Sequence, residues 1–176
     1  TFYQAMDAAQ HLVTLDPVAV ELVDDTMIEL ARSIPIFQPT VEEAVRGNPA
    51  ALLLVEFAEE DMAENERRLR QLHEMMGDLG FGWDKGAAWR GGVVDAIDPG
   101  MQGRISEWRK SGLNIMMSEK SEAKPVSFLE DCAVELKDLA EYTDKLTAIF
   151  DRNGVKGTWY AHASVGCLHV LSLIHI

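Results

Sequence analysis

Two kinds of hydrophobic pattern alternate along the chain. In the first, apolar residues recur every three or four positions, which is the period of an amphipathic helix. This spacing predicts helices over residues 2–14, 25–34, 60–77, 99–117 and 136–152. In the second, apolar residues recur at every second position or run on continuously, which is typical of strands. This pattern predicts strands over 17–23, 51–57, 91–97, 126–134 and 158–163, and the start of another at 167–170.

Residues that start or stop helices support several of these boundaries. Asp24 is suited to cap the helix after it, because its carboxylate can accept hydrogen bonds from the first backbone N–H groups. Asp98, followed by a proline, has the same role in front of the fourth helix, and Gly154 supplies the left-handed stop of the last one. The proline-containing segment 35–49 is expected to be a loop. The almost continuously apolar segment 51–57 is expected to be a central strand covered on both faces.

This order of elements predicts the α+β class. We expect a ferredoxin-like arrangement, in which one mixed or antiparallel sheet carries helices packed on one side. The strand that begins at Cys167 is expected to be cut short, so that the fold is truncated at its C-terminal end. The glycines at 77, 80 and 82 do not match G-x-G-x-x-G, and no Walker sequence occurs. The nucleotide-binding core of a larger protein is therefore not expected in this chain.

Composition excludes several classes of partner. The chain is 47% hydrophobic and 26% charged, as soluble globular domains are. Its 29 acidic against 16 basic residues give a net charge of −13, which repels phosphate backbones and argues against nucleic acid. No apolar run approaches the roughly 20 residues that a transmembrane helix needs. Cys132 and Cys167 lack CxxC spacing, which excludes a disulfide scaffold and an internal iron–sulfur motif; we interpret them as two buried thiols in a reducing compartment.

The two ends of the sequence are unlike those of a complete natural protein. The chain opens at Thr1, without an initiator methionine or a signal-peptide pattern. The last six residues, LSLIHI, are what the string CTG TCT CTT ATA CAC ATC encodes, which resembles a transposon adaptor of sequencing libraries. We therefore expect an incomplete domain over 1–170 and a tail of adaptor origin over 171–176, in which His175 has no function.

A pair of histidines is the sharpest candidate for chemistry. His162 and His169 lie seven positions apart, at the end of one predicted strand and the start of the next, with Gly166 between them. Glycine suits a tight reversal of the backbone, so two antiparallel neighbours would bring both rings to one point. Two neutral imidazoles at one point suit a divalent ion such as zinc, which needs at least one more ligand. The alternative is two unrelated histidines, as we expect for the surface or structural residues His11 and His73.

The segment from Ala161 to His169 resembles a known family. It is similar to the G-H-x-G-D-G-N-x-H segment in the C-terminal domain of FAD-linked oxidases, the flavoproteins of the D-lactate, glycolate and D-2-hydroxyglutarate dehydrogenase type. Both histidines and Gly166 match, whereas the first Gly, the Asp and the Asn are replaced by Ala161, Val165 and Cys167. This variant resembles the branch of large fused proteins that carry a flavin domain, this domain and a downstream iron–sulfur region.

Three further motifs occur in the family's order. Val20-Glu21-Leu22-Val23-Asp24 resembles its early E-L-x-D, and Trp108-Arg109 its W-x-x-R or W-R element. The strand ending in Glu130-Asp131-Cys132-Ala133-Val134 resembles E-D-x-A-V, although Glu135 replaces the proline that usually follows. The resemblance covers essentially residues 1–170.

The resemblance implies a division of labour in a longer parent protein. An absent N-terminal domain would hold FAD, and this chain would cover the flavin ring and shape the pocket for a D-2-hydroxy acid. A possible iron–sulfur cluster would lie elsewhere in the parent. The partners of this chain would be the small-molecule substrate and the parent's own FAD domain and downstream region. The parent would be cytoplasmic and could associate peripherally with the inner face of the membrane.

Roles for individual residues follow from the same resemblance. His162 and His169 would be two of three protein ligands of a divalent ion, usually zinc, and the third ligand and the catalytic base would lie beyond Val170. This chain would therefore contain no catalytic residue and would be inactive in isolation. Arg109 is the candidate that holds the substrate carboxylate; its alternative is an ion pair with Glu107 or a neighbouring acid. Glu130 and Asp131 could orient the histidines or simply end a strand.

Two other functions remain open at this point. The chain could be a non-enzymatic domain that binds metal through the two histidines and has no flavin domain before Thr1. It could also be a ligand-binding α+β domain of the kind that regulates enzymes by binding amino acids, which would have no need of the histidine pair.

Overall fold

The computed structural model describes residues 1–83, 91–117 and 124–174 of the chain. Its strands are β1 (Ala19–Asp24), β2 (Ala51–Glu56), β3 (Lys124–Ala133), β4 (Lys156–His162) and β5 (Cys167–Ile174). Its α-helices are α1 (Phe2–Leu12), α2 (Asp25–Ser33), α3 (Gln38–Ala44), α4 (Met62–Asp78), α5 (Pro99–Lys110), α6 (Gly112–Met117) and α7 (Leu139–Arg152). The strands form one sheet in the order β2-β1-β4-β5-β3, and every neighbouring pair in it is antiparallel.

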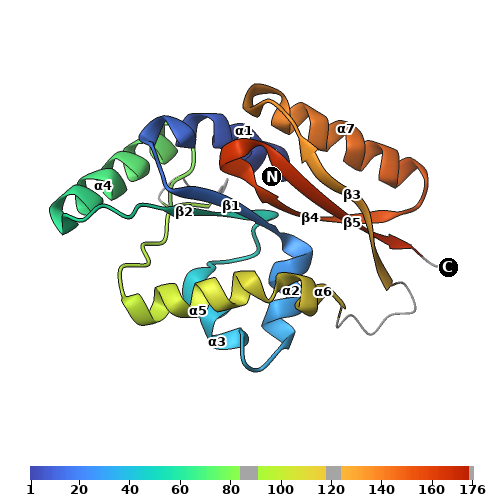
Figure 1. Cartoon of the computed structure of the whole chain (residues 1–176), viewed down its shortest axis with the longest axis horizontal. Helices are drawn as coiled ribbons and strands as arrows, with labels where there is room; N and C mark the ends of the chain where they lie inside the picture. Colours follow the sequence, from blue (N-terminus) through green and yellow to red (C-terminus); the bar gives the residue numbers. More distant parts are fainter. Residues whose placement is uncertain (84–90, 118–123, 175–176) are drawn as a thin grey trace.

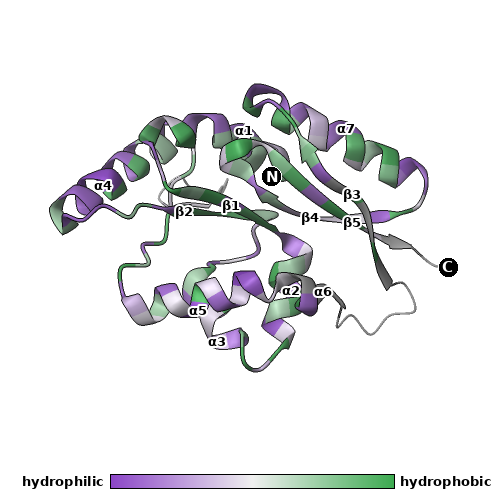
Figure 2. Ribbon diagram, in the orientation of Figure 1, coloured by the Kyte–Doolittle hydropathy of each residue, from purple (hydrophilic) through white to green (hydrophobic). Residues whose placement is uncertain are grey.

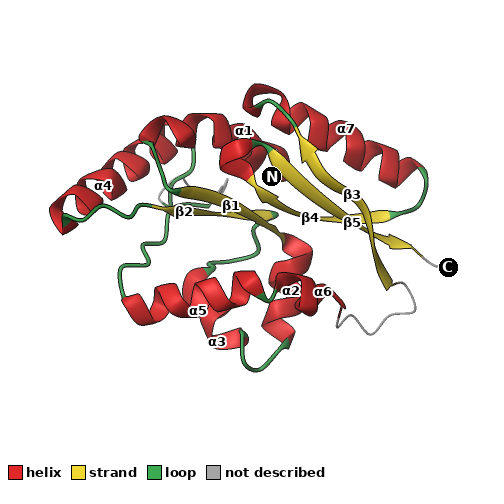
Figure 3. Cartoon of the chain, in the orientation of Figure 1, coloured by secondary structure: helices red, strands yellow, loops and turns green. Residues whose placement is uncertain are grey.

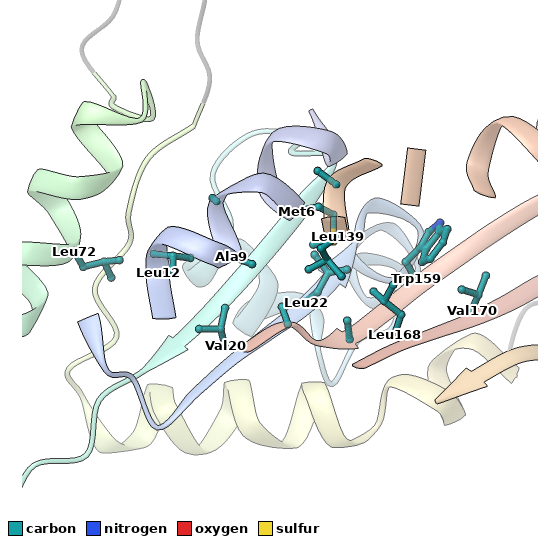
Figure 4. Packing of buried hydrophobic residues seen from close by; sticks show 14 of the residues in the cluster. Met6, Ala9, Leu12, Val20, Leu22, Leu72, Leu139, Trp159, Leu168 and Val170 are labelled. Atoms are coloured by element: carbon teal, nitrogen blue, oxygen red, sulfur yellow. The ribbon is translucent and has the colours of Figure 1, made fainter. Parts of the chain in front are cut away.

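One face of the sheet carries the main hydrophobic core. Helices α1, α4 and α7 lie over this face (Figure 1). Every second residue of the inner strands points into the core, as the strand period requires; Figure 4 shows the side chains of Val20, Leu22, Trp159, Leu168 and Val170 from the sheet packed with those of Met6, Leu12 and Leu139. Figure 2 shows the matching pattern on the outside, where α4 is mostly hydrophilic.

A second group of helices lies on the other side of the sheet. Helices α2, α3, α5 and α6 lie together below the sheet in the view of Figure 3. They pack around Trp108, whose side chain is fully buried. Met27 of α2 joins this group to the sheet through Val23 and Leu171. The break between α5 and α6 comes at Gly112, where an added Cβ would lie 2.1 Å from the terminal methyl of Met27. A larger residue at this position would require the flexible end of the Met27 side chain to move.

The α+β class and the antiparallel sheet predicted from the sequence are confirmed. The sequence predicted helices on one side of the sheet only. In the structure α1, α4 and α7 lie on one side, and α2, α3, α5 and α6 lie on the other. Asp24 and Asp98 cap their helices, and Gly154 has a φ of +66°, as predicted. Among the residues described, no helix has both the length and the apolar character that crossing a bilayer requires.

Three local predictions are wrong. Segment 91–97 forms no strand. Its apolar residues alternate because Val93 packs into the main core and Val94 packs into the second helical group. Segment 35–49 contains α3, whose first turn accommodates a proline. Strand β2 is an edge strand. Its continuous apolar run reflects cover on both faces, because it packs against the main core on one side and against the Val23–Met27–Leu171 cluster on the other.

Strand β5 continues past Val170 to Ile174. Leu171, Ser172 and Leu173 pair with both β3 and β4, and Leu171 and Ser172 are buried. The adaptor origin of 171–176 stays a prediction, and His175 lies outside the described residues.

Asp24 ties this fold together at the junction of β1, α2 and β4. Its carboxylate accepts hydrogen bonds from the backbone N–H groups of Met27, at 3.0 Å, and Trp159, at 2.8 Å. Burial raises the pKa of Asp24 from 3.8 to about 6, against the opposing effect of the hydrogen bonds from Met27, Trp159 and Thr158. The side chain is only 3% exposed, so the shift acts almost without solvent screening.

We expect this carboxyl group to make the free energy of unfolding depend on pH. Because its pKa is raised in the folded state, its contribution is fully present below pH 3.8 and is lost as pH rises through about 6. The loss amounts to about 3 kcal/mol. Urea unfolding of the wild-type chain and of Asp24→Asn between pH 3 and 7 measures this: the difference in stability between them should change by about that amount across this interval. A difference that does not change with pH would contradict the assignment.

Candidate functional site

The sheet face opposite the main core gathers polar side chains from three adjacent strands. In β4 and β5, His162 lies directly opposite Cys167, and Tyr160 lies opposite His169. In β1, Glu21 lies opposite His162. Because side chains alternate between the two faces of a sheet, these five residues share one face. This polar cluster lies on the side of the sheet to which Arg109 of α5 reaches.

The turn between β4 and β5 fixes the spacing of the two histidines. A short 3-10 turn over Ala163–Val165 ends at Gly166, which has a φ of +66°. A Cβ at Gly166 would lie 1.9 Å from the carbonyl oxygen of Val134, and the Val134 N–H donates to the Gly166 carbonyl at 2.9 Å. The tight reversal predicted from the sequence is therefore present, and it is held against the end of β3.

His162 lies beside the acidic side chain of Glu21 and the basic side chain of Arg109. Its Nδ1 is 2.9 and 3.0 Å from the two carboxylate oxygens of Glu21, and the same carboxylate forms an ion pair of 2.5 Å with Nη2 of Arg109. The Arg109 Nη2 also lies 3.3 Å from Nδ1 of His162. We assign the proton to Nδ1, since a carboxylate only accepts hydrogen bonds. That tautomer leaves the Nε2 lone pair of His162 available as a ligand.

His169 is largely buried and is held by three neighbours. Its ring stacks on Tyr160, with ring centroids 4.6 Å apart and an interplanar angle of 15°. Its Nδ1 lies 3.5 Å from a carboxylate oxygen of Asp131, and its Nε2 lies 3.9 Å from Sγ of Cys167. The ring of His162 approaches edge-on, with the two centroids 5.4 Å apart. The structure thus brings the two predicted histidines together.

Asp131 reaches His169 because β3 is irregular there. The pairing with β5 jumps from Leu129–Val170 to Cys132–Leu168, so β3 contains one extra residue. Asp131 takes a φ of +54°, a left-handed conformation that is rare outside glycine, asparagine and aspartate. Such a bulge re-aims a side chain, here toward β5. Of the predicted orienting pair, Asp131 lies beside a histidine and the side chain of Glu130 is not among those described.

Arg109 projects from the last turn of α5. Its neighbour Trp108 anchors that turn in the second helical group. The ion pair of Arg109 is with Glu21 and not with Glu107, which instead lies 3.7 Å from the Lys110 ammonium group. The guanidinium has five N–H donors in a planar fork, so a second carboxylate can bind to it beside that of Glu21.

The side chains of this arrangement are of the types that can hold a divalent metal ion. Each histidine has its Nδ1 beside a carboxylate, which is how proteins orient imidazoles that bind metal through Nε2. The donor atoms of Asp131, Cys167 and His169 lie within 4.8 Å of one another. The sequence did not predict that Glu21 and Cys167 would lie beside the histidines. Glu21 was noted only as part of a motif, and Cys167 only as a buried thiol. The signal was the strand period, because positions 167 and 169 must share a face.

Two further histidines of the described residues, His11 and His73, are separate from this cluster. His73 of α4 has its Nε2 2.8 Å from a carboxylate oxygen of Asp95, and His11 lines a shallow hollow between α1 and α4. Both positions agree with the surface or structural role expected for them.

Comparisons with known proteins identify the family of this chain. The family model described as "FAD linked oxidases, C-terminal domain" matches residues 1–175. Proteins named D-2-hydroxyglutarate dehydrogenase are similar to the chain: that of Pantoea ananatis is 30% identical over 96% of the chain, and that of Escherichia coli is 29% identical over 97%. The protein of this name from Haemophilus influenzae is 25% identical over 97%. The chain spans 17% of the length of each of these relatives.

Proposed function

Because the chain belongs to the family of FAD-linked oxidase C-terminal domains, we propose that it forms the substrate and metal side of a longer flavoprotein that oxidises a D-2-hydroxy acid. The observation that supports this most strongly is the meeting of His162, His169 and Arg109 on one face of the sheet. The substrate class follows the relatives, which are named for D-2-hydroxyglutarate. D-Lactate is the other substrate type that the motifs suggest.

Arg109 would bind and orient the substrate. A planar guanidinium holds a carboxylate through two parallel hydrogen bonds, which fixes the direction of the adjacent Cα–H bond. Trp108 limits the motion of the α5 turn from which Arg109 projects. Glu21 holds one end of the guanidinium through Nη2, so the fork is positioned before a substrate arrives.

The two histidines would hold a divalent ion, for which we propose zinc. The donor set fits: two imidazoles, each with a carboxylate at Nδ1, satisfy the chemistry that zinc prefers. When bound, such an ion stabilises negative charge on the hydroxyl oxygen of the substrate. Further ligands and the base that takes the hydroxyl proton are expected from another part of the parent, since we assign no catalytic base in this chain.

FAD would be bound mainly by another domain of the parent. This chain contains no glycine-rich phosphate loop for a dinucleotide. The substrate would lose its Cα hydride to the flavin and its hydroxyl proton to the base, which yields a 2-oxo acid. The sequence variant around His162 extends the proposal to a parent with an iron–sulfur region and a cytoplasmic location, peripheral to the inner face of the membrane.

The role of Arg109 can be tested in the parent protein. Arg109→Ala should lower kcat/KM for D-2-hydroxyglutarate by about 100-fold, because the loss of a charge-assisted hydrogen-bonded pair costs about 3 kcal/mol. Arg109→Lys should recover only part of the loss, because an ammonium group cannot bind in the planar fork geometry. Anaerobic flavin bleaching by the substrate gives the rates.

Arg104→Ala is the matched control. Arg104 lies on the same helix and pairs with Glu43 at 2.5 Å, away from the histidines, so its replacement should leave kcat/KM unchanged. Equal losses in the two variants would show that Arg109 acts only through the stability of α5. A parent whose flavin is not bleached by D-2-hydroxy acids would overturn the proposed function itself.

A further inference from the structure

Cys167 stands where the family's segment has asparagine, and the sheet places it within the histidine cluster. Residues 167 and 169 are two apart in β5, so their side chains leave the same face. Cys167 is also directly opposite His162 in β4. It is therefore a neighbour of one histidine across the strands and of the other along the strand.

The contacts of His169 turn its Nε2 toward this thiol, and His162 lies opposite Cys167 across the strands. Glu21 lies at Nδ1 of His162, and Asp131 lies at Nδ1 of His169, so both carboxylates occupy the nitrogen that does not bind the ion. The remaining Nε2 of His169 is 3.9 Å from Sγ of Cys167. Nitrogen and sulfur ligands of one tetrahedral zinc ion lie about 3.5 Å apart, so His169 and Cys167 need only a small closure to share an ion.

We infer that Cys167 is a thiolate ligand of the ion that His162 and His169 hold, so that this chain by itself supplies a two-histidine, one-cysteine zinc site. The inference rests on the proposed function of the two histidines and adds the third ligand. Binding displaces the thiol proton to solvent, and the S–Zn bond takes its place. The fourth position is left for a group from outside the chain, as in zinc sites that act on substrates.

A thiolate changes which metal the site selects. Imidazole and carboxylate donors bind manganese, iron and zinc alike, whereas thiolate favours zinc over the harder ions manganese and magnesium. Asp131 acts as a positioning residue through Nδ1 of His169, and the bulge that turns it toward β5 serves that contact. The site of this chain should therefore prefer zinc or cobalt to manganese by a wider margin than two histidines alone would give.

The test is cobalt and zinc binding to the 176-residue chain under reducing, anaerobic conditions. The wild type should show the near-ultraviolet charge-transfer absorption of a cobalt–thiolate bond. X-ray absorption of the zinc form should show one sulfur at about 2.3 Å beside nitrogens at 2.0–2.1 Å. Cys167→Ser and Cys167→Asn should lose the charge-transfer band, and their zinc affinity should fall at least about tenfold.

Cys132→Ser is the matched control, because Cys132 packs against the main core on the other face of the sheet. It should keep both the band and the affinity, and circular dichroism should verify the fold of each variant. Metal bound through His162 and His169 with no sulfur scattering in the wild type would overturn the thiolate ligand and leave the proposed function intact. Binding unaffected by His162→Ala and His169→Ala, or no binding at all, would overturn the metal role in the proposed function as well.

Discussion

Replacing His169 with alanine is expected to lower turnover of the parent flavoprotein by about 10³-fold or more. A metal ion that stabilises charge on the substrate oxygen contributes several kcal/mol, and 4 kcal/mol corresponds to about that factor. The loss should be large because His169 is buried and held on two sides, by Tyr160 and Asp131, so no neighbouring group can move into its place. Chelation of the wild type should give a loss of the same order, reversed by added zinc.

His73→Ala is the control for this variant. His73 lies on α4 and pairs with Asp95, apart from the cluster in the described part of the chain, so its replacement should leave both turnover and metal content unchanged. Metal analysis of the purified proteins supplies the second readout: the His169→Ala protein should lose zinc even in excess metal. Full turnover after both chelation and His169→Ala would remove the ion from the mechanism.

Of the substitutions that add one methyl group to the described part of the site, we expect Gly166→Ala to lower the free energy of unfolding most. An alanine at a φ of +66° costs about 1 kcal/mol. Its Cβ would also meet the carbonyl oxygen of Val134 at 1.9 Å, a backbone atom that cannot rotate away. We expect a total loss of about 3–4 kcal/mol of unfolding free energy, with loss of metal binding because β4 and β5 shift relative to each other.

Gly154→Ala separates the two causes. Gly154 has the same φ of +66°, but an added Cβ there meets nothing within 4 Å. It should therefore lose only the conformational part, about 1 kcal/mol, and keep its metal affinity. Urea denaturation and zinc titration of both variants make the comparison. Equal destabilisation by the two substitutions would mean that the turn relaxes easily and does not fix the spacing of the histidines.

The fold could be predicted wherever local chemistry decides the structure. Asp24 caps α2 because a carboxylate before a helix has backbone donors within reach, whatever the tertiary context. Segment 91–97 was mistaken for a strand because its alternation is real but serves two separate cores. Strand β2 was predicted to be central because a continuous apolar run indicates that both faces of a strand are covered. An edge strand with helices on both sides of the sheet is covered in the same way.

The part of the candidate site that depends on local sequence could also be predicted. The spacing of His162 and His169 across a glycine turn indicated convergence, and the antiparallel pairing of β4 with β5 confirms that the rings meet. The ion pair between Arg109 and Glu21 joins residues 88 positions apart (109 − 21), so no local pattern could reveal it. Asp131 depends on a bulge, whose position a periodic pattern does not encode.

Diffraction from crystals of the zinc-loaded chain, recorded on both sides of the zinc absorption edge, tests the shared ion most directly. We predict one anomalous peak on the sheet face toward which Arg109 of α5 projects, at about 2.0–2.1 Å from Nε2 of His162 and from Nε2 of His169. A peak bound to only one of these rings, or zinc located only elsewhere on the acidic surface, would contradict the account.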